Sequence, residues 1–195
     1  MKQALYIDCC VRGAASRTRR LADAFFAALG KDWQVTRLDL TQEELRPLCG
    51  AYFEERESLL REGRTDHPRF DRAHRLAEAE LVVVAAPFWD MSFPALLKLY
   101  IENVSVEGIT FRSTAEGLKG LCRAERCVFL TSRGGAYPDG DPMEQAVPYL
   151  RAIQRFFGIG GLDVIAADGL DLDGADVNAI TAAACGRAAA LARTL

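Results

Sequence analysis

Short apolar runs alternate along the chain with longer stretches in which apolar and polar residues mix at helical spacing. The apolar runs predict five strands, at residues 5–8, 34–38, 81–86, 126–131 and 162–167. The mixed stretches predict five helices, over residues 16–29, 68–79, 94–104, 142–157 and 174–194. Pro94 and Pro142 stand where the first turn of a helix tolerates proline. Apolar strands that alternate with helices indicate a parallel sheet covered on both faces.

This alternation predicts an α/β fold in which a doubly wound, five-stranded parallel sheet has the strand order 2-1-3-4-5 and helices on both faces. The chain has 195 residues, half of them hydrophobic, which suits a single domain over residues 1–195. Two segments are additional to such a sheet. Residues 41–66 are polar with a helical pattern, and residues 108–127 have the pattern of a hairpin or lid. Long connections of this kind are often functional.

The charges nearly balance, and this changes which partners we expect. The 24 basic and 27 acidic residues give a net charge of -3, so there is no overall basic excess for nucleic acid or an anionic membrane. No apolar run reaches the roughly 18 residues of a membrane span, and the first residues lead straight into a strand, so we expect a cytoplasmic protein. The six cysteines and two histidines lack the spacing of metal ligands. We therefore expect no metal site, and reduced thiols.

The stretch "CCVRGAASRTRR", residues 9–20, lies between the first predicted strand and the first predicted helix. A helix start has unpaired backbone N–H groups and the positive end of the helix dipole, so it binds anions readily. Ser16 and Thr18 add two hydroxyl donors for a phosphate. An alternative remains open, in which Ser16 only caps the helix. We assign Arg19 and Arg20 to a solvated helix face.

Three unusual loops follow the first, third and fourth predicted strands: "CCVRGAASRT", "PFWDMSFP" and "SRGGAYPDGDP". In a doubly wound sheet of this order they meet at the carboxyl edge, where ligands bind. The aromatic pair Phe88-Trp89 suits a flat ligand, and the backbone N–H groups of Gly134-Gly135 suit the polar edge of a ring. Taken singly, Trp89 also fits ordinary packing and the glycine pair an ordinary turn.

Other nucleotide-binding folds fit this sequence less well. It has no Walker loop, and no G-x-G-x-x-G follows the first strand. A phosphoacceptor domain would need a carboxylate at the end of the third strand, where this chain has Pro87. A phosphate-type helix start beside a place for a planar ring indicates flavin mononucleotide (FMN).

The segments "AAPFWDMSFPALLKLYIENVSVEGITF" and "TSRGGAYPDGDP", and the order strand, Ser16-x-Thr18, helix, resemble the family of FMN-dependent NADH:azoreductases and NAD(P)H:quinone oxidoreductases. The resemblance runs over most of the chain and implies a flavodoxin-like fold. It also implies three groups of FMN-binding residues: Cys9, Ser16, Arg17 and Thr18 at the phosphate, Pro87, Phe88, Trp89, Asp90 and Met91 beside the isoalloxazine, and Ser132, Arg133, Gly134 and Gly135 at its pyrimidine edge.

One loop departs from this family. Azoreductases of the family tend to read Met-Tyr-Asn-Phe where this chain has Phe88-Trp89-Asp90-Met91. Trp89 is still aromatic at the position where those azoreductases have tyrosine. A carboxylate of Asp90 that faced the ring would oppose negative charge on the reduced flavin and lower its potential.

The resemblance implies an FMN-dependent oxidoreductase with a ping-pong mechanism. NADH or NADPH reduces the flavin and leaves, and a flat aromatic acceptor, quinone-like or azo, then takes two electrons. The flavin carries the chemistry, so no side chain need be catalytic, and the adjacent thiols of Cys9 and Cys10 are not expected to act. Two alternatives remain, an electron carrier for protein partners and a flavin-free regulatory domain of the same fold.

A homodimer is also expected. On a helical wheel the apolar residues of the predicted helix 94–104 spread over about 200°, wider than one sheet face requires. The surplus would meet a second subunit, and the resemblance implies a dimer formed beside the flavin, in which the acceptor pocket includes the other chain near Tyr52 and Phe53. In the alternative, the chain's own 108–127 segment covers this helix.

Overall fold

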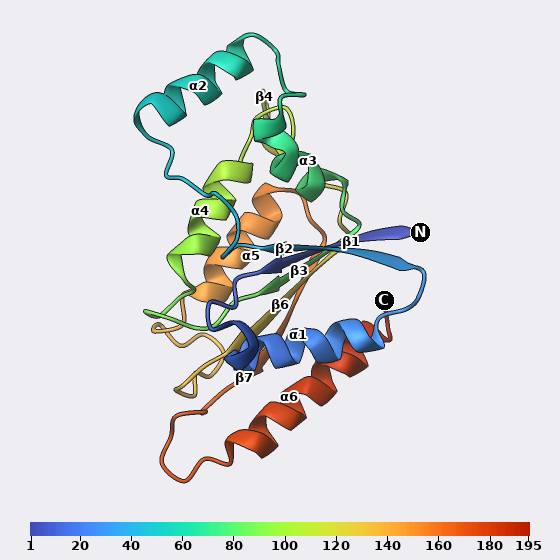
Figure 1. Cartoon of the computed structure of the whole chain (residues 1–195), viewed down its shortest axis with the longest axis vertical. Coiled ribbons are helices and arrows are strands. Elements are labelled where there is room, and N and C mark those ends of the chain that lie inside the picture. The colour runs from blue at the N-terminus through green and yellow to red at the C-terminus, as the bar shows by residue number, and fades with distance from the viewer.

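Five parallel strands form the central sheet of the computed structural model, which describes all residues from 1 to 195. The sheet contains β1 (Lys2–Asp8), β2 (Trp33–Asp39), β3 (Leu81–Ala85), β6 (Arg126–Ser132) and β7 (Gly161–Ala167), in the order β2-β1-β3-β6-β7 (Figure 1). In register, Ile7 of β1 lies between Leu38 of β2 and Val84 of β3. The predicted five-stranded parallel sheet is confirmed.

The strand numbering differs from the predicted order because two strands do not join the sheet. The strands β4 (Phe111–Thr114) and β5 (Gly117–Gly120) pair with each other as a separate antiparallel hairpin between β3 and β6. This hairpin accounts for the centre of the additional segment 108–127.

Helices cover the two faces of the sheet unequally. The helices α1 (Arg17–Ala28) and α6 (Val177–Ala192) lie along one face, and α3 (Asp71–Glu78), α4 (Ala95–Val104) and α5 (Ala146–Phe156) lie on the other (Figure 1). The short 3-10 helices Gly13–Ala15 and Pro68–Phe70 precede α1 and α3. The helix α2 (Gly50–Arg61) lies at one end of the molecule, and Leu59 is its one buried residue.

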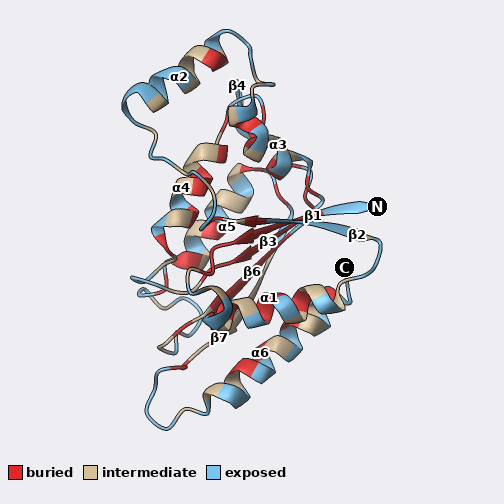
Figure 2. Cartoon of the chain, viewed as in Figure 1, coloured by how far each residue is buried: buried red, intermediate tan, exposed pale blue.

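The central strands β1, β3 and β6 are largely buried because both of their faces meet a helix layer, whereas the edge strand β2 is mostly exposed (Figure 2). Side chains alternate along a strand, so Val82 and Val84 join a core of 27 buried residues under α3, α4 and α5. Val83 and Ala85 join a core of 16 residues under α1 and α6. Continuous apolar runs in the sequence therefore reflect burial on two sides.

The predicted start of one helix at Pro142 is wrong. The preceding residues form turns of their own, in which Asp141 Oδ1 accepts a hydrogen bond from the N–H of Met143 at 2.8 Å. The carboxylate of Glu144 then accepts from the N–H of Val147 at 3.2 Å. These local bonds stop the helix from extending toward Pro142, and α5 begins at Ala146.

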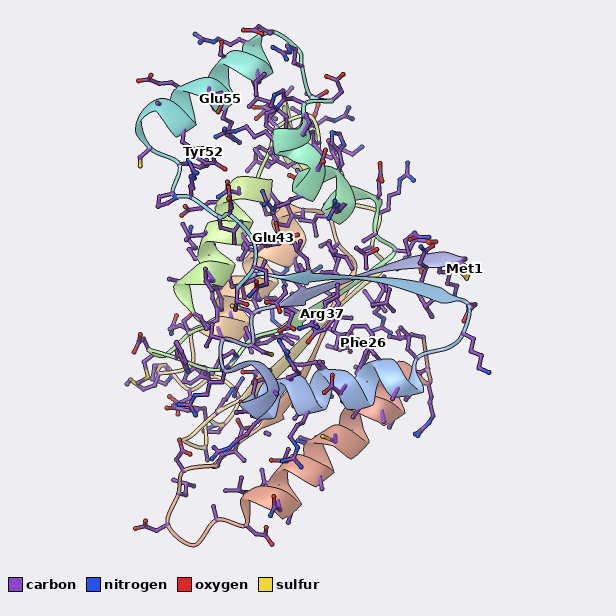
Figure 3. All side chains as sticks on the ribbon, viewed as in Figure 1. Met1, Phe26, Arg37, Glu43, Tyr52 and Glu55 are labelled. Carbon is purple, nitrogen blue, oxygen red and sulfur yellow. The ribbon has the colours of Figure 1, made fainter.

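The chain itself covers part of the outer surface of α4. The hydroxyl of Tyr52 on α2, which is labelled in Figure 3, donates to Asn103 Oδ1 of α4 at 2.8 Å. The Asn103 amide in turn donates to the carbonyl of Arg46 at 2.9 Å. Segment 41–66 therefore covers this part of α4, whereas the alternative considered from the sequence involves segment 108–127. None of the helices has the length and apolar character needed to cross a membrane.

Candidate functional site

A pocket of about 160 Å³ opens at the carboxyl edge of the sheet, beside the start of α1. Most of the predicted site residues line it: Ser16, Arg17, Pro87, Phe88, Trp89, Ser132, Arg133 and Gly134. Four further lining residues were missed from the sequence: Arg12, Ala15, Leu170 and Asp171. The loops after β1, β3 and β6 therefore meet as expected, and the loop after β7 joins them.

Ser16 both caps α1 and lines the pocket. Its Oγ accepts a hydrogen bond from the N–H of Arg19 at 3.3 Å, which is an N-cap. The first turn of α1 contains no acidic residue, while Arg12 and Arg17 line the pocket in front of it. The cap and a contact with an anion are therefore compatible at this position.

Thr18 lies behind the pocket wall rather than in its lining. It is fully buried, and its Oγ1 lies 2.6 Å from Ser132 Oγ, with which it shares a hydrogen bond. This bond joins the first turn of α1 to the end of β6. Thr18 thus fixes the relative position of two of the three predicted loops.

A buried charge lies below the loop that follows β1. Asp8 is 0 % exposed and accepts hydrogen bonds from Arg19 at 2.8 Å and from Arg37 Nε at 2.9 Å. Its other oxygen accepts from the N–H of Cys10 at 2.9 Å. Arg37 extends from β2 into the space between the sheet and α1 (Figure 3). The expectation that Arg19 lies on a solvated face is wrong, because Asp8 holds it; Arg20 is exposed.

The aromatic loop makes a tight turn over residues 89–92. Trp89 and Ser92 exchange two backbone hydrogen bonds of 3.0 and 2.8 Å, and both central residues, Asp90 and Met91, have positive φ angles of 50° and 63°. This is the geometry of a type I′ turn, which favours glycine or asparagine, so the turn is strained. Trp89 is 42 % exposed, which argues against ordinary packing. Asp90 and Met91 do not line the pocket.

Arg133 places a buried positive charge behind the glycine loop. Its side chain is 6 % exposed and lies 3.4 Å from Glu144 and 3.5 Å from Asp168, over the ring of Phe88 at 5.6 Å. Burial raises the pKa of Asp168, and the Arg133 guanidinium opposes this shift. Arg133 Nε has no hydrogen-bond partner.

Gly135 does not line the pocket, but it shapes the same loop. A Cβ at Gly135 would lie 3.0 Å from the ring of Tyr137, closer than side chains ordinarily approach. Close approach, and not backbone conformation, therefore favours glycine at this position, which argues against an ordinary turn.

The two adjacent cysteines point into the cores. Cys9 and Cys10 are both 0 % exposed and belong to opposite core layers. Burial raises the pKa of each thiol to about 12, so neither forms a thiolate near neutral pH. Cys9 does not line the pocket, contrary to its predicted place at the phosphate, because its side chain packs under α4 and its N–H donates to Ala85 O at 2.8 Å.

The donor set of the pocket suits an anionic group joined to a planar ring. Three arginines and one aspartate line it, together with the hydroxyls of Ser16 and Ser132 and the uncovered start of α1. The half-buried Phe88 and the exposed Trp89 provide aromatic surface at the other end. A phosphate at the helix start and a flat ring at the aromatic loop are the two parts of FMN, so the residues present fit this cofactor.

Comparisons with known proteins agree with this geometry. A family described as having a flavodoxin-like fold matches residues 2–192. The chain is 38% identical over 186 residues to "FMN-dependent NADH:quinone oxidoreductase 2" of Clostridium acetobutylicum, in an alignment that covers 92% of each chain. It is 38% identical over 185 residues to an FMN-dependent NADH:quinone oxidoreductase of Clostridium perfringens, which covers 91% of each. The crystal structure of an azoreductase from Bacillus anthracis is 26% identical, with a TM-score of 0.87 over 100% of both chains.

Proposed function

The chain belongs to the family of FMN-dependent NADH:quinone oxidoreductases with a flavodoxin-like fold, and from this premise we propose that it transfers two electrons from NADH to a quinone-like or azo acceptor through bound FMN. The observation that carries the proposal is the pocket at the carboxyl edge, which joins an uncovered helix start to an aromatic turn and a glycine loop. FMN, when bound, supplies the redox chemistry by accepting two electrons and passing them on.

Ser16 and Arg17 hold the phosphate in this proposal. Both line the pocket at the start of α1, where backbone N–H groups and the helix dipole attract an anion. Thr18 acts from behind them, because its bond to Ser132 fixes the helix start against β6. Cys9 does not contact the phosphate in this proposal, since its side chain is buried and its N–H donates to Ala85 O.

The ring lies against the turn of Pro87 to Met91 in this proposal. Trp89 and Phe88 provide its aromatic contact. A hydrogen bond from the N–H of Gln145 to Met91 O, at 2.9 Å, anchors the strained turn that carries them. Asp90 and Met91 adopt the left-handed conformation that the turn requires, and their side chains do not line the pocket, so the ring meets the backbone of this turn.

The pyrimidine edge meets the residues from 132 to 135. Gly134 and Gly135 leave their backbone N–H groups approachable, while the guanidinium of Arg133 is paired with Glu144 and Asp168. Backbone donors arranged in advance would favour negative charge at this edge of the bound cofactor. The residues thereby assist two-electron reduction without a catalytic acid.

A second copy of the chain completes the pocket in this proposal. About 160 Å³ is less than ordinary small-molecule sites offer, so one chain leaves a large part of the flavin uncovered. Exposed apolar side chains on the loops next to the pocket, Trp89, Met91 and Met143, suit such a partner, as does Phe53 on α2. A monomer at micromolar concentration in light scattering would contradict this part of the proposal.

The decisive experiment measures the absorbance spectrum and NADH oxidation together. The purified protein, reconstituted with FMN, is expected to show flavin bands after gel filtration and to oxidise many equivalents of NADH when a quinone or azo acceptor is supplied. FMN retention without NADH oxidation would indicate an electron carrier. No FMN retention would indicate a flavin-free domain of the same fold.

A further inference from the structure

An ion pair crosses the pocket between two loops that are distant in sequence. Arg17 Nη1 lies 3.0 Å from Asp171 Oδ1, and both residues line the pocket. Asp171 is the one acidic residue in that lining. Arg17, which lies at the proposed phosphate position, is therefore already paired with a carboxylate.

The backbone around Asp171 is fixed. The N–H groups of Gly169, Leu170 and Asp171 donate to the carbonyls of Gly135, Arg133 and Gly134 at 3.0, 3.1 and 3.0 Å. Leu170 is also buried in the core under α1 and α6. The Asp171 carboxylate therefore leaves Arg17 by rotation of side chains and not by movement of the loop.

The Asp171 carboxylate also lies against the glycine loop. A Cβ at Gly134 would lie 2.4 Å from Asp171 Oδ2, while the φ angle of Gly134 is outside the region that favours glycine. The carboxylate lies in the space that a side chain at position 134 would fill, so it packs against this loop as well as against Arg17. One Asp171 oxygen faces Arg17 and the other faces Gly134.

We propose that the Asp171 carboxylate competes with the flavin phosphate for Arg17 and thereby lowers the affinity of the site for phosphorylated flavins. The inference rests on the proposed function, because it requires the phosphate to lie at Arg17. A phosphate that reaches the guanidinium must displace or repel the carboxylate, since like charges at short range oppose each other. Both side chains of the pair are partly exposed, at 38% and 69%, so the effect is small, up to about fivefold.

The test compares FMN with riboflavin, which lacks the phosphate. Dissociation constants for both flavins are measured by quenching of flavin fluorescence with wild-type apo-protein and with Asp171→Asn. The variant is expected to bind FMN about threefold to fivefold more tightly and riboflavin within twofold of wild type. In an Arg17→Gln background the same change should have less than half of this effect on a logarithmic scale.

Asp173→Asn is the matched control, because Asp173 is an exposed aspartate of the same loop that does not line the pocket. It changes the net charge equally and should leave both affinities unchanged. Equal changes in the dissociation constants of FMN and riboflavin in Asp171→Asn would overturn the proposal, because Asp171 would then act on the part of the flavin that both ligands share. Weaker FMN binding would overturn it in favour of a role in orienting Arg17. Failure of the wild type to bind either flavin would instead reject the proposed function.

Discussion

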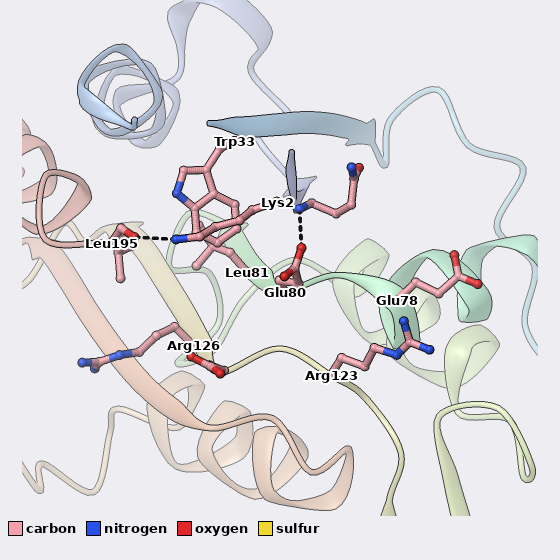
Figure 4. Close-up of a pocket in the computed structure, with 10 residues that line it drawn as sticks. Lys2, Trp33, Glu78, Glu80, Leu81, Arg123, Arg126 and Leu195 are labelled. Carbon is pink, nitrogen blue, oxygen red and sulfur yellow. Dashed lines mark hydrogen bonds between the residues drawn. The ribbon is translucent and has the colours of Figure 1, made fainter. Parts of the chain in front are cut away.

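The two ends of the parallel sheet have pockets of opposite character. The amino end has a pocket of about 650 Å³ with ten lining residues, among them Lys2, Trp33, Glu80 and Arg123 (Figure 4). The carboxyl end has a pocket of about 160 Å³. The larger pocket lies at the amino ends of the strands, which is where a helix such as α1 ends before the next strand begins. The smaller one lies where α1 begins, so the uncovered N–H groups face the smaller one.

Several polar groups at the amino end have partners within the pocket. The N–H of Gln3 donates to Glu80 Oε2 at 2.9 Å, and Lys2 donates to the carbonyl of Leu195 at 3.4 Å (Figure 4). Lys2 also lies 4.8 Å above the Trp33 ring.

Three glutamates balance the two arginines and one lysine of the amino-end lining, whereas the carboxyl end has three arginines and one aspartate. Arg17 and Arg133 have carboxylate partners, so Arg12 is the lining arginine without an ion pair. This arginine and the start of α1, rather than volume, distinguish the end that can bind an anion.

The largest difference between the two ends is expected in the free energy of unfolding, when a buried carboxylate is removed at the carboxyl end and an exposed one at the amino end. Asp8→Ala removes a fully buried carboxylate and leaves Arg19 and Arg37 without it. Loss of one partner of a buried pair costs about 3–5 kcal/mol, and we expect about 3 kcal/mol here because both arginines reach water. Guanidinium denaturation of the apo-protein measures this free energy of unfolding.

Asp32→Ala is the matched variant at the amino end. Asp32 forms an ion pair with Lys2 at 3.7 Å and its side chain is 62% exposed. Its removal should cost no more than about 1 kcal/mol. Equal losses in the two variants would mean that burial of the Asp8 carboxylate does not distinguish the two ends.

The second prediction separates a helix cap from a ligand contact. Hydrogen bonds to a charged group contribute about 1.5–3 kcal/mol, so Ser16→Ala should weaken FMN at least about tenfold. It should also lower apo-protein stability by about 1 kcal/mol, because the cap on Arg19 is lost. Fluorescence titration with FMN and thermal melting of the apo-protein measure the two effects.

Asp176→Ala provides the control for the cap. Asp176 caps α6 by accepting from the N–H of Ala179 at 2.9 Å, and it does not line the pocket. This variant should lose similar stability and keep its FMN affinity. If Ser16→Ala also melts lower with unchanged FMN affinity, Ser16 is a cap alone and the phosphate lies elsewhere.

A smaller effect is expected for the two thiols at the carboxyl end. Burial raises the pKa of Cys9 and Cys10 to about 12, so both stay protonated and unreactive at pH 8. Cys9→Ser and Cys10→Ser should retain NADH oxidation within about twofold, because FMN and not a thiol carries the electrons. Alkylation of the folded protein at pH 8 should modify the exposed Cys49 first. Loss of turnover with FMN still bound would show that a thiol takes part.

Much of the fold could be predicted from the sequence because burial on two faces leaves a strong pattern. The run at residues 81–86 is apolar throughout because it lies at the centre of the sheet. The start of α5 could not be predicted, since Asp141 and Glu144 form local bonds that compete with the helix, and periodicity does not record such bonds.

The site could be predicted where one loop carries its own chemistry, as with Ser16 at a helix start or the pair Phe88-Trp89. Arg19 was misplaced because its partner, Asp8, lies on a strand and pairing across elements leaves no local signal. Asp171 was missed for the same reason, since 154 positions separate it from Arg17. The rule that strand ends meet at one edge also applies to the strand before Asp171, so its loop could have been included.

The smallest effect is expected from changes in the larger pocket. Glu80→Gln keeps an acceptor for the N–H of Gln3 and removes one charge from a balanced set. The strand β1 separates this pocket from the start of α1 by about 20 Å, at about 3.3 Å per residue. This distance exceeds the Debye length of about 8 Å at physiological salt, so the lost charge is screened. FMN affinity should stay within about twofold of wild type, with a small change in melting temperature. A loss comparable with that of Ser16→Ala would show that the two ends are coupled through the sheet, and the contrast between them would not hold.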